Sequence, residues 1–255
     1  MADTVDKLQL EHLVKEVYGK VANEPHGHYH FELGRDLALR LGYPSEMLDR
    51  LPKGAVDSFA GVGYHFDFAK LQRGESVLDL GSGSGMDSFF AEAQVGETGR
   101  VVGIDMTAEQ LANAERLREG RFGTVVFQEA RIEELPFDAG SFDAAISNGV
   151  INLVDDKGKA FREISRVLRR GGRMAISDIV TEKQLTSGIV CDATLWASCI
   201  GGATQQDAYQ QAIEDAGMRV VAIRENPQYR FLSESAQEAT EEFGVKSISL
   251  LAEKT

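Results

Sequence analysis

Three glycines at alternate positions, Gly81, Gly83 and Gly85, form the clearest chemical pattern in the sequence. They follow a short apolar run, typical of a buried strand, that carries one acidic residue, Asp79. Glycine lets a backbone turn sharply and approach a ligand where a Cβ atom would clash. The N-terminus of the helix that follows favours a polar or anionic group. We therefore expect a nucleotide-like ligand at this turn, contacted by Asp79, Gly81, Ser82, Gly83 and Gly85.

The spacing of the glycines separates two classes of nucleotide-like ligand. A dinucleotide site uses G-x-G-x-x-G, in which the third glycine lets helix and strand pack closely around a pyrophosphate. Here that position is Met86, and the third glycine comes one residue earlier, with Asp87 just inside the helix. The spacing disfavours an NAD-dependent oxidoreductase, which remains the competing enzyme class and would be supported by tight binding of NADH.

A second acidic residue, Asp105, ends the next apolar run, 24 residues after Gly81. A carboxylate at a strand end accepts hydrogen bonds from ribose hydroxyls in dinucleotide-binding folds. We therefore expect Asp105 and its neighbour Met106 to contact the ligand. Thr107 followed by Gln110 predicts a capping box at the start of the next helix, and we expect Gln110 to lie at the ligand as well.

Strand and helix patterns alternate from residue 76 onward, which predicts βαβ units around a parallel sheet. We expect strands at 76–80, 100–105, 124–128, 142–147 and 173–179, helices at 86–95, 107–119, 157–169 and 205–216, and then strands at 219–224 and 246–252 around a helix at 233–243. Gly171 and Gly172 are expected to end the helix at 157–169. The predicted fold is α/β, with a Rossmann-like, seven-stranded, mostly parallel sheet that contains one antiparallel strand.

The residues before this sheet predict helices. Apolar side chains at helical spacing predict an amphipathic helix over 4–22, a short helix over 33–41, and another that opens at 42–45 and runs to Leu51. The glycine-rich segment 58–64 is expected to be a loop over the ligand site. We expect residues 1–72 to form an N-terminal helical cap and residues 73–255 to form the ligand-binding domain, within one integrated unit.

The order of these motifs resembles that of class I S-adenosylmethionine-dependent methyltransferases. The resemblance implies S-adenosylmethionine as the cofactor, backbone groups near Arg131 and Ile132 against its adenine, and Asn148 near its methionine end. Longer strings look like the arsenite methyltransferase family, within the wider group of ubiquinone- and menaquinone-type small-molecule methyltransferases. These strings are SFAGVG (58–63), VLDLGSGSGMD (77–87), VGIDMTAEQL (102–111), SNGVINL (147–153), FREISRVLRRGGRMAISDIV (161–180) and CIGGA (199–203).

The resemblance also implies an acceptor held between cysteine thiolates, which suit trivalent arsenic as they suit soft metals. Cys199 matches one cysteine of the family and is the candidate catalytic residue. Gly149 stands where the family usually has a second cysteine, and His26, His28 and His30 occupy the N-terminal segment where it has another. We expect a small-molecule methyl acceptor, metalloid or organic. The alternatives are an organic acceptor of the ubiquinone or menaquinone type, or binding of the cofactor without catalysis.

The three histidines alternate in a polar loop that Pro25 and Gly27 interrupt. Alternate residues share a face if the loop is extended, and histidine is a common metal ligand, so a metal site is one interpretation. We expect instead a loop that contacts the substrate or forms part of a lid, without a metal. The N-terminal helix, with Tyr18, is expected to fold over the cofactor together with this loop, and Trp196 is expected to line the acceptor pocket.

The composition argues against several kinds of partner. A chain of 255 residues, 43% of them hydrophobic, is long enough to bury a sizeable core. A net charge of −13 without a long run of Lys or Arg argues against nucleic acid. No apolar stretch reaches about 18 residues and the start of the chain does not look like a leader, so we expect no membrane association. Two cysteines are too few for a disulfide framework. We expect a cytoplasmic protein, monomeric or homodimeric.

Overall fold

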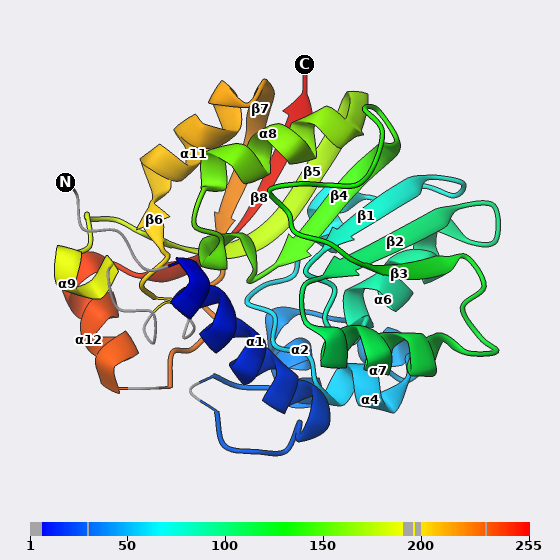
Figure 1. Cartoon of the computed structure of the whole chain (residues 1–255), viewed down its shortest axis with the longest axis horizontal. Coiled ribbons are helices and arrows are strands. Elements are labelled where there is room, and N and C mark those ends of the chain that lie inside the picture. Colours follow the sequence, from blue (N-terminus) through cyan, green and yellow to red (C-terminus); the bar gives the residue numbers. More distant parts are fainter. Residues whose placement is uncertain (1–6, 30, 191–195, 197–199, 233) are drawn as a thin grey trace.

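A computed structural model describes residues 7–29, 31–190, 196, 200–232 and 234–255, and it is built around one sheet (Figure 1). The strand order is β3-β2-β1-β4-β5-β8-β7. The strands of this path are β1 (Ser76–Leu80), β2 (Arg100–Asp105), β3 (Val125–Glu129), β4 (Phe142–Asn148), β5 (Leu168–Thr181), β7 (Met218–Glu225) and β8 (Lys246–Lys254). Strands β1 to β5 run parallel, and β8 runs antiparallel to both of its neighbours. The short strand β6 (Thr204–Gln205) adds an eighth member beside β5. The predicted Rossmann-like, mostly parallel sheet is confirmed.

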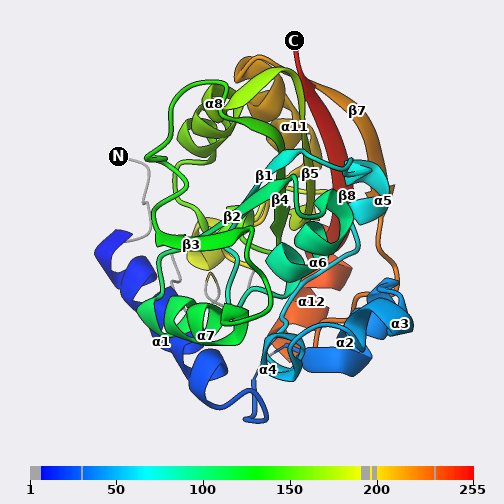
Figure 2. The same cartoon turned by 90° about the vertical axis from the view of Figure 1, so that its right-hand side faces the viewer.

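The strand residues alternate between two apolar cores, one on each face of the sheet. Val77 belongs to the first core, whereas its neighbour Leu78 belongs to the second. Helices that contribute to the first core are α2 (Gly34–Leu41), α3 (Ser45–Leu48), α4 (Lys53–Asp57), α5 (Phe66–Ala69), α6 (Met86–Val95) and α7 (Ala108–Arg118). The second core is covered by α8 (Lys157–Val167) and α11 (Gln206–Asp215), which lie together on the opposite face (Figures 1 and 2).

The first described helix, α1 (Lys7–Asn23), lies beside α7 in both views (Figures 1 and 2). The remaining helical elements are η1 (Ile151–Leu153), α9 (Ser187–Val190) and α12 (Glu234–Phe243). Within the described ranges, no helix combines the length and the apolar character that crossing a bilayer requires.

The boundary between α8 and β5 differs from the prediction. The helix ends at Val167 rather than at residue 169, and Leu168 is already extended and pairs with Phe142 of β4. Gly171 and Gly172 therefore lie inside β5 and do not end the helix. The pairing with β4 is irregular between Phe142 and Ala144, which accommodates the additional residues of β5. Burial of the Leu168 side chain in the second core favours this early strand over a longer helix.

The third helix predicted before the sheet is shorter than expected. The helix expected to run to Leu51 ends at Leu48, and α4 begins separately after Pro52. Proline lacks an N–H group and disfavours a helical conformation in the residue before it, so the chain restarts a helix there. Helices α4 and α5 were not predicted, because each is only about one turn long.

The register of the sheet brings three strand ends to one edge. Leu80 of β1 pairs with Ile104 of β2 on one side and with Ser147 of β4 on the other. The residues that follow, Gly81, Asp105 and Asn148, therefore emerge side by side. In open α/β sheets this edge, at the carboxyl ends of the strands, is where ligands bind.

Candidate functional site

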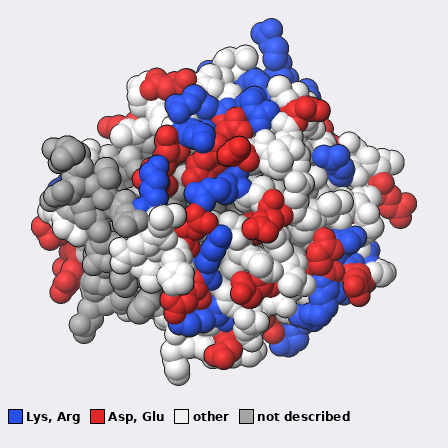
Figure 3. Space-filling view, in the orientation of Figure 1, with Lys and Arg blue, Asp and Glu red and all other residues white. Residues whose placement is uncertain are grey.

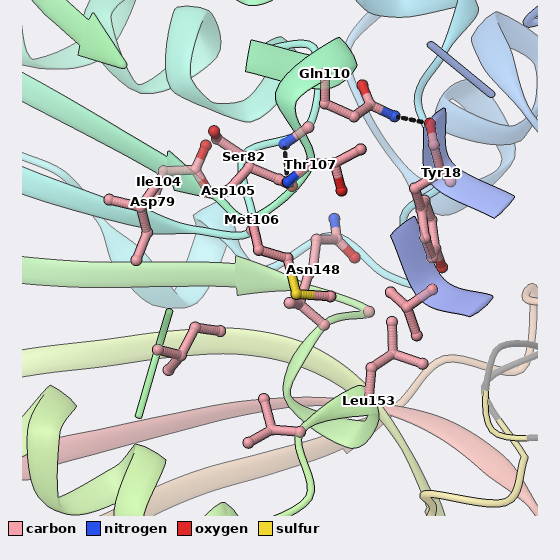
Figure 4. Close-up of a pocket in the computed structure, with 18 of the residues that line it drawn as sticks. Tyr18, Asp79, Ser82, Ile104, Asp105, Met106, Thr107, Gln110, Asn148 and Leu153 are labelled. Atoms are coloured by element: carbon pink, nitrogen blue, oxygen red, sulfur yellow. Dashed lines mark hydrogen bonds between the residues drawn. The ribbon is translucent and has the colours of Figure 1, made fainter. Parts of the chain in front are cut away.

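A cavity opens at the carboxyl ends of β1, β2 and β4, and α1 forms one of its walls (Figure 4). The loop at Ser58–Gly61 also lines it, as predicted for the glycine-rich segment. Residues of the predicted site that line the cavity are Tyr18, Asp79, Gly81, Ser82, Gly83, Asp105, Met106, Gln110, Arg131, Ile132 and Asn148. The structure therefore brings together side chains that lie up to 130 residues apart in the sequence.

The glycine turn is held by backbone hydrogen bonds to the neighbouring strand. The N–H groups of Gly81 and Ser82 both donate to the carbonyl of Ile104, each at 2.8 Å. Gly81 has a φ of 73°, and a Cβ atom there would lie 2.5 Å from the Val150 side chain. Glycine is required at this position for both reasons.

Asp105 is fixed by two backbone donors. One carboxylate oxygen accepts from the N–H of Gly83 at 3.0 Å, and the other accepts from the N–H of Thr107 at 2.8 Å. Burial raises the pKa of Asp105, and these two hydrogen bonds oppose that shift. The carboxylate thus ties the glycine turn to the start of α7 while it lines the cavity.

The predicted capping box at the start of α7 is wrong. Thr107 precedes the helix, but its side chain makes no capping hydrogen bond. The Gln110 side chain instead accepts from the Ser84 hydroxyl at 2.6 Å. It also donates to the carbonyl of Tyr18 at 2.9 Å (Figure 4). Tertiary partners on the glycine turn and on α1 have replaced the local capping partner.

Asn148 fixes the glycine-rich loop to the end of β4. Its Oδ1 accepts from the N–H groups of Val62 and Gly63, at 2.8 and 3.2 Å. Its Nδ2 lies 3.0 Å from the Gly63 carbonyl, 3.0 Å from the Tyr43 hydroxyl oxygen and 3.1 Å from Oδ2 of Asp87. The side chain that was predicted to meet the ligand thus also orients the loop that lines the cavity.

Two buried carboxyl groups, Asp79 and Asp87, lie in the cavity wall. Burial, together with the charge of Asp87, raises the pKa of Asp79 to about 8, against opposing hydrogen bonds from the side chain and the backbone of Ser88. Burial also raises the pKa of Asp87 to about 6, and hydrogen bonds from Tyr43 and Asn148 limit that shift. Neither carboxyl group forms an ion pair with another side chain in the described ranges.

Sequence analysis did not identify Tyr43, whose hydroxyl donates to Oδ1 of Asp87 at 2.7 Å. Tyr43 follows α2, 44 residues before Asp87, and no motif surrounds it. For Asp87 a signal existed, since the residue follows the glycine turn directly. A close aromatic cluster around Tyr43, with Phe59, Tyr64 and Phe90, holds its ring in place.

The wall formed by α1 combines apolar side chains with two ion pairs. Leu10 and Val14 face the cavity between Lys7 and Tyr18. Lys7 pairs with Asp155, and Glu11 pairs with Arg131, so both pairs join α1 to the loops after the strands. Basic and acidic side chains are interspersed over this face of the molecule (Figure 3).

A family model described as a methyltransferase domain matches residues 71–217. The chain belongs to the methyltransferase domain family. Curated relatives include an arsenite methyltransferase of Halobacterium salinarum, 38% identical over 72% of this chain and 47% of the relative. The arsenite methyltransferase of Mus musculus is 43% identical over 50% of this chain and 36% of the relative. This methyltransferase chain therefore spans less than half the length of these curated relatives.

Solved structures agree with this assignment. The crystal structure of an arsenic(III) S-adenosylmethionine methyltransferase from Chlamydomonas reinhardtii is 28% identical, with a TM-score of 0.65, over 87% of this chain and 74% of that one. A geranyl diphosphate methyltransferase solved with S-adenosylmethionine has a TM-score of 0.68 at 18% identity, over 90% and 100% of the two chains, and shows the same fold. Both of these solved proteins are described with S-adenosylmethionine, the first as its methyltransferase and the second as bound to it.

The residues present fit this cofactor. The Ser82 hydroxyl is buried in the cavity wall and has no hydrogen-bond partner among the described residues. Asp79 and Asp87 are buried carboxyl groups for which the described chain supplies no basic partner. A ligand with hydroxyl groups, an ammonium group and a positively charged sulfur offers partners to both kinds of group.

Several predicted site residues lie elsewhere. Gly85 precedes α6 and packs under Phe89 and Phe127 rather than lining the cavity. His26 is exposed beside Asp57, and neither it nor His28 lines the cavity.

Trp196 is buried against Leu10 and Val14 of α1, outside the cavity. His30 and Cys199 fall outside the described residues. Within those residues no group of three His, Cys, Asp or Glu side chains forms a metal site.

Proposed function

We propose that this chain transfers the methyl group of S-adenosylmethionine to a small molecule. The observation that carries the proposal is the convergence of Gly83, Asp105 and Asn148 on one cavity that α1 walls off. The cofactor, when bound, supplies an electrophilic methyl group on a positively charged sulfur. Methyl transfer is an in-line displacement, so the chain must chiefly hold the acceptor in line and keep water out.

The proposed contacts follow from the position of each group in the cavity wall. Asp105 would accept hydrogen bonds from the ribose hydroxyls, because its carboxylate lies at the end of β2. Residues near Arg131 and Ile132 would contact the adenine. The glycine turn would hold the amino acid end, where the unpartnered Ser82 hydroxyl and the carboxyl groups of Asp79 and Asp87 supply polar contacts.

The proposed role of α1, within the cap of residues 1–72, is to cover the bound cofactor. Leu10, Val14 and Leu153 give this part of the cavity an apolar wall, which excludes water from the reacting groups. Limited proteolysis with and without S-adenosylmethionine tests this role. We expect the cofactor to protect α1 and the loop after it, and equal cleavage near residues 20–30 in both conditions would contradict it.

The acceptor is proposed to be held without the full set of cysteine thiolates that the family resemblance implies. Both cysteines of the chain, Cys191 and Cys199, lie outside the described residues, so this proposal rests on Gly149. Gly149, where the resembling family usually has cysteine, lines the cavity and has a φ of 75°. Because Gly149 lacks one thiol that the resemblance implies for arsenite, we propose organic acceptors ahead of arsenite. One curated relative is named for a reaction with an organic acceptor: a ubiquinone/menaquinone biosynthesis C-methyltransferase of Escherichia coli, 40% identical over 44% of this chain.

A labelled-methyl assay with arsenite, methylarsenite, thiols, phenols and quinols tests the proposal. We expect label in at least one organic product, at a rate above that with arsenite. A general base is needed only for acceptors that must lose a proton, so the rate with each acceptor as a function of pH separates these cases. Arsenite turnover above that of every organic acceptor would refute the preference for organic acceptors.

Calorimetric titration separates methyl transfer from the other functions. Binding of S-adenosylmethionine with no label in any acceptor would support a protein that binds the cofactor without catalysis. Tight binding of NADH without binding of S-adenosylmethionine would support an oxidoreductase and overturn the proposal.

A further inference from the structure

A second cavity, of about 260 Å³, lies beside the cavity at the carboxyl ends of β1, β2 and β4, where methyl transfer is proposed. Asp155 lines both cavities, and the second extends from there between α8, α11 and the segment that enters β6. This volume is slightly below the roughly 300–1,000 Å³ of sites for drug-sized ligands, so it suits a smaller molecule. Its lining residues are Asp155, Lys157, Gln184, Val190, Trp196, Gly201, Gly202, Ala203, Thr204, Ala208, Tyr209 and Ala212.

The cationic group in this cavity is Lys157, the first residue of α8. Its Nζ donates to the carbonyl of Val154 at 2.9 Å and lies 4.9 Å from the centre of the Trp196 ring. An ammonium group has three donors, so one hydrogen bond to a carbonyl and a cation–π contact leave donors for a further acceptor. None of the ion pairs between described residues includes Lys157.

The charges of two carboxyl groups, Asp178 and Asp155, act on Lys157, but both groups interact with other donors. Asp178 accepts from the Tyr209 hydroxyl at 2.6 Å and from the N–H groups of Asn152 and Ile179. Asp178 does not line the cavity, whereas Tyr209 does. Asp155 is paired with Lys7 of α1. Burial lowers the pKa of Lys157, and the charges of Asp178 and Asp155 oppose that shift.

The rest of the cavity wall is apolar and contains small side chains. Ala203, Ala208 and Ala212 leave space that larger residues would fill. Trp196 is fixed there, because its indole N–H donates to the carbonyl of Val190 at 2.6 Å. Gly202 allows the ring this close approach, since a Cβ atom there would lie 2.7 Å from the indole.

We propose that this second cavity binds a small molecule that carries a carboxylate on an apolar body about one ring in size. The carboxylate accepts a charge-assisted hydrogen bond from Lys157, and the ring lies among Trp196, Ala208 and Ala212. Binding at this cavity does not depend on the proposed methyl transfer.

The chain offers a direct reporter for this site, because Trp196 is its one tryptophan. The test titrates the whole protein, without cofactor, with benzoate and with benzyl alcohol, which has a similar ring and no charge. We expect benzoate to change the tryptophan fluorescence in a saturable way, with an affinity at least about tenfold above that of benzyl alcohol. Equilibrium dialysis with labelled benzoate confirms that the change reports binding.

Three variants make the test specific. Lys157→Met should weaken benzoate binding about tenfold or more, to the level of benzyl alcohol. Lys159→Met, at an exposed lysine on the same helix, should leave the binding unchanged. Ala208→Leu adds side-chain atoms at an exposed position that lines the cavity, keeps Lys157, and should also reduce binding about tenfold. Thermal unfolding checks the fold of each variant.

The proposal would be overturned by no saturable signal with benzoate, or by equal affinity for the charged and neutral probes. Benzoate binding that both Lys157→Met and Ala208→Leu leave unchanged would place the ligand elsewhere and also refute it. If Lys157→Met does not fold, Ala208→Leu decides alone. The methyl-transfer assay is unaffected by any of these results, so the two proposals fail separately.

Discussion

Nε2 of Gln110 on α7 donates a hydrogen bond to the backbone carbonyl of Tyr18 on α1, at a distance of 2.9 Å (Figure 4). The same side chain accepts from the hydroxyl of Ser84, which lies within the glycine turn. One amide group therefore joins the N-terminal helix to the turn that is proposed to hold the amino acid end of the cofactor. Asn113, one turn farther along α7, donates to the carbonyl of Ala22, one turn farther along α1.

Gln110→Met should weaken both the docking of α1 and the binding of cofactor. Methionine keeps the length of the side chain but loses the donor to Tyr18 and the acceptor for the buried Ser84 hydroxyl. Leaving such a buried group unsatisfied costs about 1–3 kcal/mol. We expect affinity for S-adenosylhomocysteine to fall about fivefold or more in calorimetry, with faster proteolysis of α1.

The control for this prediction is Gln210→Met on α11, where the glutamine pairs only with Glu214 at the surface. If Gln110→Met has the same affinity and the same rate of proteolysis as the parent and as Gln210→Met, the hydrogen bond from Gln110 to Tyr18 does not connect α1 to the cofactor site.

The sequence predicted those site residues that lie at the ends of strands or within the glycine motif. Gly81 and Asp105 end consecutive strands, and parallel strands bring their carboxyl ends to one edge, so residues far apart in sequence meet there. The apolar runs alternate with helical patterns strongly enough to predict the sheet as well. Asn148 was placed near this edge by the resemblance to class I methyltransferases, and it ends β4, which pairs with β1.

The part that the sequence did not predict depends on contacts between distant segments. Tyr43 meets Asp87 only because the chain before the sheet folds back across it. Thr107 and Gln110 have the local pattern of a capping box. The side-chain amide of Gln110 instead forms its hydrogen bonds with Ser84 and Tyr18. The Gly171-Gly172 pair looks like a helix end, yet burial of Leu168 starts the strand three residues before it. Local sequence patterns do not contain information about these tertiary contacts, so they could not be predicted from such patterns.

Asp105→Asn should lower the affinity for S-adenosylmethionine and the thermal stability together. Both carboxylate oxygens accept from backbone N–H groups, so an amide must turn its own donor toward Gly83 or Thr107. Hydrogen bonds to a charged group are worth about 1.5–3 kcal/mol, which corresponds to a loss of affinity of about tenfold or more. Calorimetric titration and thermal unfolding measure the two effects.

The matched control is Glu129→Gln, because Glu129 pairs with Asp105 in the sheet register but is exposed and does not line the cavity. It should change neither quantity. Full affinity in Asp105→Asn would exclude Asp105 as a contact of the ribose hydroxyls.

Gly149→Cys should destabilise the protein without creating efficient arsenite methylation. The φ of 75° at this position is unfavourable for a residue with a Cβ atom by about 1–2 kcal/mol. The new Cβ atom would also lie 3.1 Å from the Val62 side chain. We expect the melting temperature to fall by about 2–8 °C. Together with Cys199, the new thiol would restore only two of the positions at which the resembling family has cysteine, since the third segment carries His26, His28 and His30, so arsenite turnover is not expected to rise.

Gly149→Ala separates strain from the thiol, because it adds the same Cβ atom and no sulfur. The two variants should lose equal stability and methylate arsenite equally slowly. A gain of arsenite turnover in Gly149→Cys alone would show that a single missing thiol limits the reaction with this acceptor.

His65→Phe should make the protein less sensitive to acid. His65 is fully buried against Phe66, and neither ring nitrogen has a hydrogen-bond partner among the described residues. Burial lowers its pKa from 6.5 to about 3. The unfolded chain therefore binds a proton that the folded protein does not bind, and stability is lost as the pH falls from about 6.5 toward 3. The loss is about 1.4 kcal/mol per pH unit in that window.

Urea unfolding of both proteins at pH 7, 5.5 and 4.5 measures this difference. The difference in stability between His65→Phe and the parent should grow in favour of the variant as the pH falls, because phenylalanine does not titrate. The raised pKa values of Asp79, Asp87 and Asp178 act in the opposite direction on total stability, but they contribute equally to both proteins. His26→Phe, at an exposed histidine, is the control and should show no such growth. A constant difference at all three pH values would mean that His65 is protonated in the folded state and so has a partner for its charge.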